Sequence, residues 1–302
     1  MQRSRIVVVA KALLLMLTIL CCGVMTQYVS AQAQPVKTEK GLTVSPLRTE
    51  ITIDPGTSQK GSLTVTNETD AQLTVRFNVE EFNVTNQQYD YAFTTGSDIT
   101  KWVTYSADEV DLAVGESKKV GYIIGVPLTA EPGGRYISLF ASTTIEQTMS
   151  GVASIQRIGS LLYVTLNGEV TRAGALVSLT SQLLVNDTST WSAVVQNSGS
   201  THYRSKYIVT TQNLFGALAA PEVQGSALIL PGTVRLVQDE LPVPRFPGIY
   251  KTSYIVGLGD SPVTSEMRLM VYAPVYVQII VGALIIAAVT YVFIRLTRKS
   301  VR

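Results

Sequence analysis

The stretch LTVRFNVE at residues 73–80 alternates apolar and polar side chains along its whole length. Because successive side chains of a β-strand point to opposite faces of a sheet, this pattern predicts a strand with one buried face. Shorter runs with the same alternation occur at residues 63–65, 120–126, 207–209 and 267–271. The central part of the chain is therefore expected to consist of β-strands.

Clusters of turn-forming residues separate these runs. They are DPG at 54–56, NETD at 67–70, EPGG at 131–134, NSGS at 197–200, and PG at 231–232 and 247–248. We find no convincing amphipathic helical pattern before residue 275. Many short strands punctuated by such turns are typical of an all-β fold of the β-sandwich type.

A weak internal repeat divides the strand-rich region into two units. In the first unit a strand ends in VP at residues 126–127, and a Pro-Gly turn at 132–133 is followed by Tyr136. The same order recurs in the second unit, with VP at 243–244, Pro-Gly at 247–248 and then Tyr250. We therefore predict two immunoglobulin-like β-sandwich domains, at residues 41–170 and 175–273.

The N-terminal segment has the features of a secretory signal peptide. Basic residues at positions 3, 5 and 11 precede an apolar run at 12–25, and small residues at 29–33 have cleavage-site spacing. A first transmembrane helix is the disfavoured alternative, because the run is shorter than the ~20 residues that a bilayer core requires. Residues 1–33 are expected to be removed together with Cys21 and Cys22, which leaves the mature chain without disulfides or thiolate metal sites.

The C-terminal segment predicts a membrane anchor. Residues 275–294 are almost wholly apolar and long enough to cross a bilayer as a helix. The tail at 295–302 contains four basic residues and no acidic one, which places it on the cytoplasmic side. We therefore expect a single-pass protein of the cell membrane, with an extracellular N-terminal ectodomain and a short cytoplasmic tail.

Composition and motifs exclude several classes of function. The net charge is only +2 and its positive excess lies at the two termini, so no surface for nucleic acid is expected. The single histidine, His202, follows the turn at 197–200 and is interpreted as an exposed turn residue. The chain lacks the Gly-x-Ser-x-Gly motif of a nucleophile elbow. We therefore expect no enzyme activity, no cofactor and no metal site.

Two further groups of residues are candidates for chemistry. Carboxylates gather at Asp108, Glu109 and Asp111 and at Glu80 and Glu81, where a calcium site or a glycosidase pair is the functional alternative to solvated charge. Neither group has a supporting loop pattern, and solvated charge is favoured.

The tryptophans at positions 102 and 191 each begin a strand pattern. An indole face suits a sugar ring, but this position in the pattern favours core packing over sugar stacking.

The motifs resemble those of known surface proteins. The run from Trp102 through VDLAVGES at 110–117 and VP at 126–127 to PGGRY at 132–136 resembles the back half of bacterial immunoglobulin-like surface domains. The front half, from LTVSP at 42–46 through DPG at 54–56 to VTN at 65–67, resembles the N-terminal domain of periplasmic pilus chaperones and the first domain of WxL-interacting proteins. The complete layout is similar to the WxL-interacting family, which implies adhesion at the bacterial cell wall or binding to surface partners.

Three functions follow as hypotheses. The first is a non-enzymatic, membrane-anchored surface protein that attaches to cell-wall polymer or to another secreted or surface protein. The second is a chaperone-like surface assembly factor that binds extended peptides by strand addition. The third, which is disfavoured, is an enzyme with an unrecognised site.

Strand addition requires an unpaired strand edge. The first candidate edge is the leading strand at residues 42–47. The second is the last strand of the first domain, whose nearly continuous apolar character predicts burial on both sides or a covering partner. The alternative that this last strand pairs centrally in its own sheet stays open. Its candidate binding residues are Leu161, Leu162, Tyr163, Val164, Thr165 and Leu166.

Overall fold

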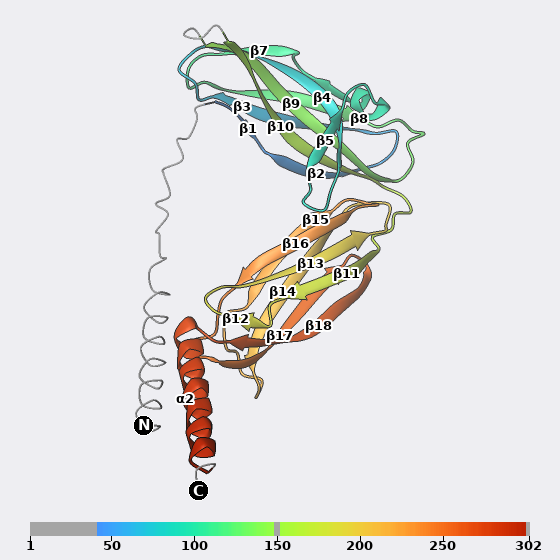
Figure 1. The fold of residues 1–302 in the computed structure, drawn as a ribbon. Helices are drawn as coiled ribbons and strands as arrows, with labels where there is room; N and C mark the ends of the chain where they lie inside the picture. The colour runs from blue at the N-terminus through green and yellow to red at the C-terminus, as the bar shows by residue number, and fades with distance from the viewer. Residues whose placement is uncertain (1–40, 148–151, 300–302) are drawn as a thin grey trace. The chain divides into compact units, whose positions relative to one another are not determined.

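The computed structural model describes residues 41–147 and 152–299 (Figure 1). The chain is mostly β-strand, arranged as two β-sandwiches of immunoglobulin type, and ends in one long apolar helix. The predicted all-β fold is therefore confirmed. The predicted signal peptide at residues 1–33 lies outside the described residues.

The first sandwich consists of two antiparallel layers with one parallel pairing. One layer has the order β1-β3-β8-β6, formed by β1 (Leu42–Ser45), β3 (Ser58–Asn67), β8 (Ser117–Gly125) and β6 (Val103–Tyr105). The other has the order β2-β10-β9-β4-β5, formed by β2 (Arg48–Ile53), β10 (Val152–Leu166), β9 (Gly133–Gln147), β4 (Leu73–Val84) and β5 (Tyr91–Thr94). The short β7 (Glu109–Leu112) also pairs with β4, and a 3-10 helix, η2 (Asp98–Trp102), precedes β6.

The second sandwich follows the same plan. Its smaller layer has the order β11-β13-β16, formed by β11 (Gly174–Ser181), β13 (Ser189–Asn197) and β16 (Val234–Leu241). Its larger layer has the order β12-β18-β17-β14-β15, formed by β12 (Leu184–Val185), β18 (Ser261–Tyr272), β17 (Gly248–Leu258), β14 (Tyr203–Asn213) and β15 (Val223–Ile229). Among the described strands, none pairs across the two sandwiches.

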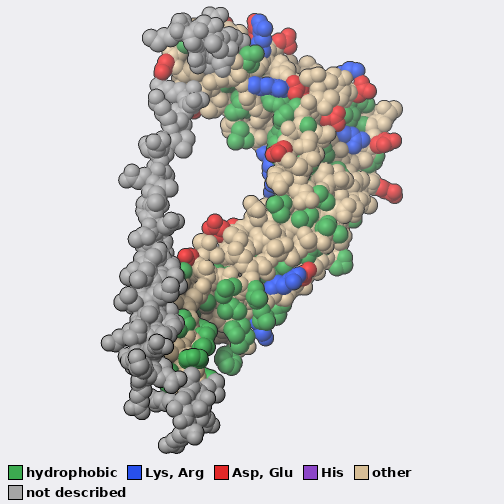
Figure 2. Space-filling model, in the orientation of Figure 1, with side chains coloured by type: hydrophobic (Ala, Val, Ile, Leu, Met, Phe, Trp, Pro, Cys, Tyr) green, Lys and Arg blue, Asp and Glu red, His purple; other side chains and the backbone are tan. Residues whose placement is uncertain are grey.

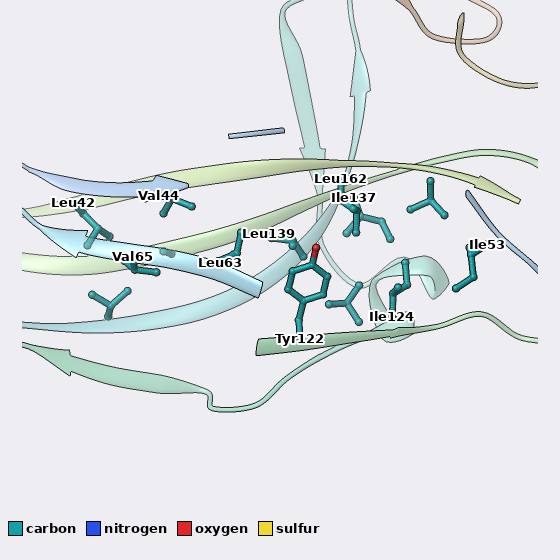
Figure 3. Packing of buried hydrophobic residues seen from close by; sticks show 14 of the residues in the cluster. Leu42, Val44, Ile53, Leu63, Val65, Tyr122, Ile124, Ile137, Leu139 and Leu162 are labelled. Atoms are coloured by element: carbon teal, nitrogen blue, oxygen red, sulfur yellow. The ribbon is translucent and has the colours of Figure 1, made fainter. Parts of the chain in front are cut away.

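The core of the first sandwich lies between its two layers (Figure 3). Leu63 of β3 and Ile124 of β8 face Leu139 of β9 across this core, and all three side chains are fully buried. The stretch 73–80 forms most of β4, with Leu73 and Val75 in the same core. The alternating pattern therefore predicted the buried face of this strand correctly.

The core of the second sandwich is built around Trp191 of β13. Its ring lies 5.1 Å from the ring of Tyr207 and 5.5 Å from that of Tyr254, centroid to centroid. The Trp191 side chain is almost fully buried, and Trp102 packs against the core of the first sandwich. Core packing was the favoured interpretation of both tryptophans, and the structure confirms it.

A buried asparagine ends the third strand of each sandwich. Asn67 is fully buried, and its Nδ2 donates to the carbonyls of Ala71, Leu112 and Ala113 at 2.7–3.1 Å. Asn197 occupies the matching place, since it too is fully buried and ends β13.

The Nδ2 of Asn197 donates to the carbonyls of Thr201 and Ile229 at 3.0 and 2.8 Å. Each amide therefore satisfies loop carbonyls that the sheets leave unpaired, which explains the turn clusters at 67–70 and 197–200.

The last element is the helix α2 (Val275–Lys299). Its window Val275–Arg295 has a mean hydropathy of 2.5, and none of that window is buried against the rest of the protein. A helix of this length spans about 30 Å, which matches the hydrocarbon core of a bilayer. By length and composition, α2 is long and apolar enough to cross a membrane.

Candidate functional site

The candidate site is a strand edge in the first sandwich. Residues 161–166 of β10 pair in parallel with β2 on one side and antiparallel with β9 on the other. The six residues named as a possible partner-binding edge, Leu161, Leu162, Tyr163, Val164, Thr165 and Leu166, therefore occupy a central position, which was the alternative left open. Their apolar side chains reflect burial on both faces of the sheet.

The open edge lies immediately upstream in the same strand. Residues 152–160 of β10 pair with β9, but β2 reaches only residues 161–166. The chain before β2 belongs to the opposite layer, where β1 pairs with β3. Among the described strands, residues 152–160 of β10 therefore have a sheet neighbour on one side only.

The direction of the backbone N–H and C=O groups shows which of them face the unpaired side of residues 152–160. The N–H of Leu161 donates to Leu47 O at 2.9 Å, so odd-numbered residues of β10 point their N–H and C=O toward the β2 side. By the same alternation, the backbone groups of Ile155, Arg157 and Gly159 point outward. Within residues 41–147 and 152–299, no hydrogen bond from outside the ladder reaches these groups.

Two polar side chains of β10 connect the opening to the leading strand. The N–H of Leu42 donates to Gln156 Oε1 at 3.2 Å, and Ser160 Oγ donates to Pro46 O at 2.6 Å. The leading strand, one of the two candidate edges, is an edge of its layer, because among the described strands β1 pairs only with β3. The edges of β1 and β10 thus flank the same side of the sandwich.

Arg157, on the outer face of the open stretch, makes an ion pair and a cation–π contact. Arg157 forms an ion pair with Glu80 at 2.5 Å, and its guanidinium lies 3.4 Å from the ring centroid of Phe140. The Glu80 carboxylate is buried and also accepts a hydrogen bond from Asn78 Nδ2 at 3.0 Å. Solvated charge was the expected state of Glu80, and the structure corrects this expectation. The contact between Arg157 and Glu80 links β10 to β4 across β9.

One apolar side chain beside the open edge is accessible. Ile155 is 73% exposed, whereas Ile158 packs against the core. An added strand would therefore meet backbone donors and acceptors along β10 and an apolar contact at Ile155. This combination suits an extended peptide with apolar side chains at alternate positions.

The environment of His202 differs from the expected exposed turn. The imidazole is buried, its Nδ1 lies 3.3 Å from the hydroxyl oxygen of Tyr136, and its ring packs against Tyr163. Burial lowers the pKa of His202 below its ordinary value of 6.5; nearby Glu50 opposes this shift, and three guanidinium groups, those of Arg172, Arg204 and Arg48, reinforce it. The imidazole therefore serves as a packed, neutral side chain.

The acidic cluster of the first sandwich lies at its surface. Asp111 Oδ1 accepts a hydrogen bond from Thr74 Oγ1 at 2.6 Å, and Glu109 forms an exposed ion pair with Arg76 at 3.2 Å. Across the part of the chain that the structure describes, no group of three His, Cys, Asp or Glu side chains is placed to hold a metal ion.

Comparisons with known proteins bear on the fold alone. The chain matches no protein-family model and no curated protein sequence. Similar solved structures include the class 5 fimbriae chaperone CfaA, with 12% identity, a TM-score of 0.40, and coverage of 76% of this chain and 99% of that chain. They also include the CsuC–CsuE chaperone–tip adhesion subunit complex of Acinetobacter baumannii pili, with 11% identity, a TM-score of 0.38, and coverage of 76% and 98%.

The Salmonella enterica SafA pilin in complex with the SafB chaperone is a further similar structure. It has 10% identity, a TM-score of 0.38, and coverage of 76% of this chain and 97% of that chain. The resemblance to the WxL-interacting family stays a prediction, since no family model or curated sequence matches.

Proposed function

We propose that this chain is a non-enzymatic, membrane-anchored protein of the bacterial surface that binds an extended segment of a partner protein as an added strand. The observation that carries the proposal is the half-paired stretch of β10, residues 152–160, whose outward backbone groups lack partners among the described residues. A strand laid beside this stretch would continue the sheet in place of β2. Such an edge is the usual template for main-chain recognition of a peptide.

The site favours a protein partner over cell-wall polymer. A peptide backbone presents N–H and C=O groups at the spacing of a sheet ladder, which a glycan does not match. The two tryptophans, which were the candidate platforms for sugar stacking, pack against the cores of the sandwiches. These two facts support the secreted or surface protein among the expected partners.

The anchor determines where binding occurs. With α2 across the membrane and the basic tail at 295–302 in the cytoplasm, both sandwiches stand on the extracellular side. A partner that leaves the cell in an extended state would meet the open edge on the extracellular side. The proposed role is therefore capture of such a partner at the cell surface.

Direct binding to defined probes tests this function. The full-length chain in lipid nanodiscs is titrated with fluorescent synthetic peptides that carry valine or isoleucine at alternate positions, and anisotropy is measured. The matched control peptides are N-methylated at alternate residues, which removes the N–H groups of one edge. Purified wall polymer is titrated in parallel.

The proposal predicts saturable binding of the unmodified peptides and at least about tenfold weaker binding of the N-methylated set, since each lost main-chain bond removes about 1 kcal/mol. Binding of wall polymer without peptide binding would instead favour attachment to the wall. Equal binding of the two peptide sets would show that strand pairing is not the mode of recognition.

A further inference from the structure

Three loop segments of the second sandwich expose apolar side chains at one end, where Figure 2 shows hydrophobic side chains in green. These loops are residues 182–188, which include the two-residue strand β12, and residues 214–222 and 242–247; the side chain of Phe215 at the tip of the middle loop is 97% exposed. Phe246 in the third loop is 66% exposed. The other exposed apolar residues of these loops are Leu183, Leu184, Leu214 and Leu218. Exposed apolar side chains that gather in this way mark a surface that contacts a membrane or another molecule.

Strand register places all three loops at the end from which α2 begins. Asn213 at the end of β14 pairs with Tyr250, and Gly248 at the start of β17 pairs with Tyr272 at the end of β18. Val185 of β12 also pairs with Tyr272. The loops that follow β14, precede β17 and flank β12 therefore all lie beside the last residues of β18.

The connection from β18 to α2 is very short. Only residues 273–274 separate β18 from α2, and two residues extend at most about 7 Å. The polar layer on each side of a bilayer core is itself about 5–7 Å thick. If α2 spans the bilayer, the end of the second sandwich must therefore lie within the headgroup layer.

A hydrogen-bonded contact joins the first turn of α2 to one of these loops. The Nε2 of Gln278 donates to Asn186 Oδ1, and also to Ala273 O at 2.8 Å. The start of the helix is therefore tied to the loop at 182–188 rather than linked by a free tether.

The exposed aromatic tips are fixed by their own loops. Asn213 Oδ1 accepts hydrogen bonds from the N–H groups of Phe215 and Ala217 at 2.9 and 3.0 Å, and Gly216 adopts a positive φ of 88° that turns the chain. These contacts hold the tip of the loop in a defined turn. In the third loop, the hydroxyl of Tyr250 donates to the carbonyl of Phe246 at 2.6 Å, which fixes that tip in the same way.

The tips of two loops carry no acidic residue. Residues 214–220, LFGALAA, carry no charge, and residues 242–247, PVPRFP, carry only the positive charge of Arg245, while the acidic Asp187 and Glu222 lie near the ends of the first two loops. Tyr276 in the first turn of α2 is 58% exposed, as expected for an aromatic residue at the boundary between water and lipid. Aromatic and aliphatic tips with an adjacent arginine are typical of segments that insert into the interfacial region.

We propose that the three loops form an interfacial collar that inserts between the lipid headgroups around the start of α2, so that the second sandwich is seated on the bilayer rather than tethered above it. The occupant of the exposed surface is the membrane that α2 spans. This inference rests on the membrane anchor of the proposed function and adds a second, independent contact with lipid.

Site-specific quenching tests the collar. The full-length chain with Cys21→Ser and Cys22→Ser receives a single cysteine by Phe215→Cys or Phe246→Cys, labelled with an environment-sensitive fluorophore. Each labelled chain is placed in nanodiscs of phosphatidylcholine and phosphatidylglycerol, with or without bromine near the headgroup end of the acyl chains. Leu128→Cys is the matched control, because Leu128 is an 81% exposed apolar loop residue of the first sandwich. Leu284→Cys, in the middle of α2, reports separately on the anchor.

The collar predicts blue-shifted emission and quenching by brominated lipid at positions 215 and 246, and neither effect at 128. Quenching at 284 without quenching at 215 and 246 would overturn the collar while leaving the anchor intact. Blue-shifted emission at 215 without lipid quenching would show that protein covers the loops, which also contradicts the proposal. Absence of quenching at 284 would refute the anchor itself, and the collar with it.

Discussion

A pair of proline substitutions in β10 separates the open half of the strand from its central half. Proline removes the backbone N–H and is tolerated in a sheet only where that N–H does not take part in the ladder. The N–H of Ile155 points to the open side, whereas that of Val164 points to β9 by the same alternation. Ile155→Pro should therefore affect binding, and Val164→Pro should affect folding.

The structure sets the size of the two effects. Val164 is fully buried, so Val164→Pro removes its ladder hydrogen bond to Arg135 of β9 at about 1–3 kcal/mol and also loses packing, for a total of about 2–4 kcal/mol. For a protein of this size, that corresponds to a fall in Tm of about 4–16 °C. Ile155 is 73% exposed, so Ile155→Pro should cost less than about 1 kcal/mol of stability. It should weaken peptide binding by about tenfold, since one main-chain bond is lost and the ring obstructs the added strand.

Thermal unfolding followed by circular dichroism, together with anisotropy of the alternating peptides, measures both effects on the full-length chain. A large fall in Tm for Ile155→Pro would show that its N–H already has a partner. A folded Ile155→Pro variant that binds peptide as tightly as the parent would show that the peptide does not pair with this stretch.

Three further predictions concern buried polar groups. Arg157→Ala leaves the buried Glu80 carboxylate without its counter-ion, so we expect a loss of about 1–3 kcal/mol of unfolding free energy in denaturant titrations. Asn67→Ala removes the donor for three loop carbonyls and should cost about 2–4 kcal/mol in the same assay. Because the pKa of folded His202 is lowered below 6.5, the unfolded chain binds the proton more tightly, and stability from this group is present above about pH 6.5 and lost as pH falls through the folded pKa. The Tm of the parent should accordingly fall more steeply on acidification than that of His202→Gln.

Each of these predictions has its own control. Arg157→Lys keeps the positive charge, so a loss as large as that of Arg157→Ala would mean that the charge is not the stabilising feature. Asn83→Ala changes an exposed asparagine and should cost less than about 0.5 kcal/mol, so an equal loss at both positions would contradict the role of Asn67. Parallel pH curves for the parent and His202→Gln would refute the effect of the buried imidazole.

The sequence predicted those parts of the fold that depend on local pattern. The alternation at 73–80 identified the strand β4, and the apolar run at 161–166 indicated burial on both sides. The point at which β2 stops pairing was not predictable, because it depends on the passage of residues 46–47 from one layer to the other. A weak signal was present, since Gln156 and Arg157 interrupt the apolar character of β10 just upstream of residue 161.

The polar residues that the sequence misplaced are buried by partners far away in the chain. Glu80 was expected in solvent because the sequence places Glu81 beside it, and its ion pair with Arg157 forms only when β4 and β10 flank β9. His202 follows a turn, but Tyr136 and Tyr163 cover its ring. Tertiary contacts of this kind carry no local pattern, which is why a single sequence did not reveal them.

Amide hydrogen exchange along β10 tests the open edge most directly. In the full-length chain, the amides of Ile155, Arg157 and Gly159 should exchange rapidly, while those of Gln156 and Ile158, which point to β9, should be protected. Addition of an alternating peptide should slow exchange at the three odd positions, and the N-methylated peptide should not. Equal protection of odd and even amides without peptide, or odd amides that stay rapid when peptide is bound, would contradict strand addition at this edge.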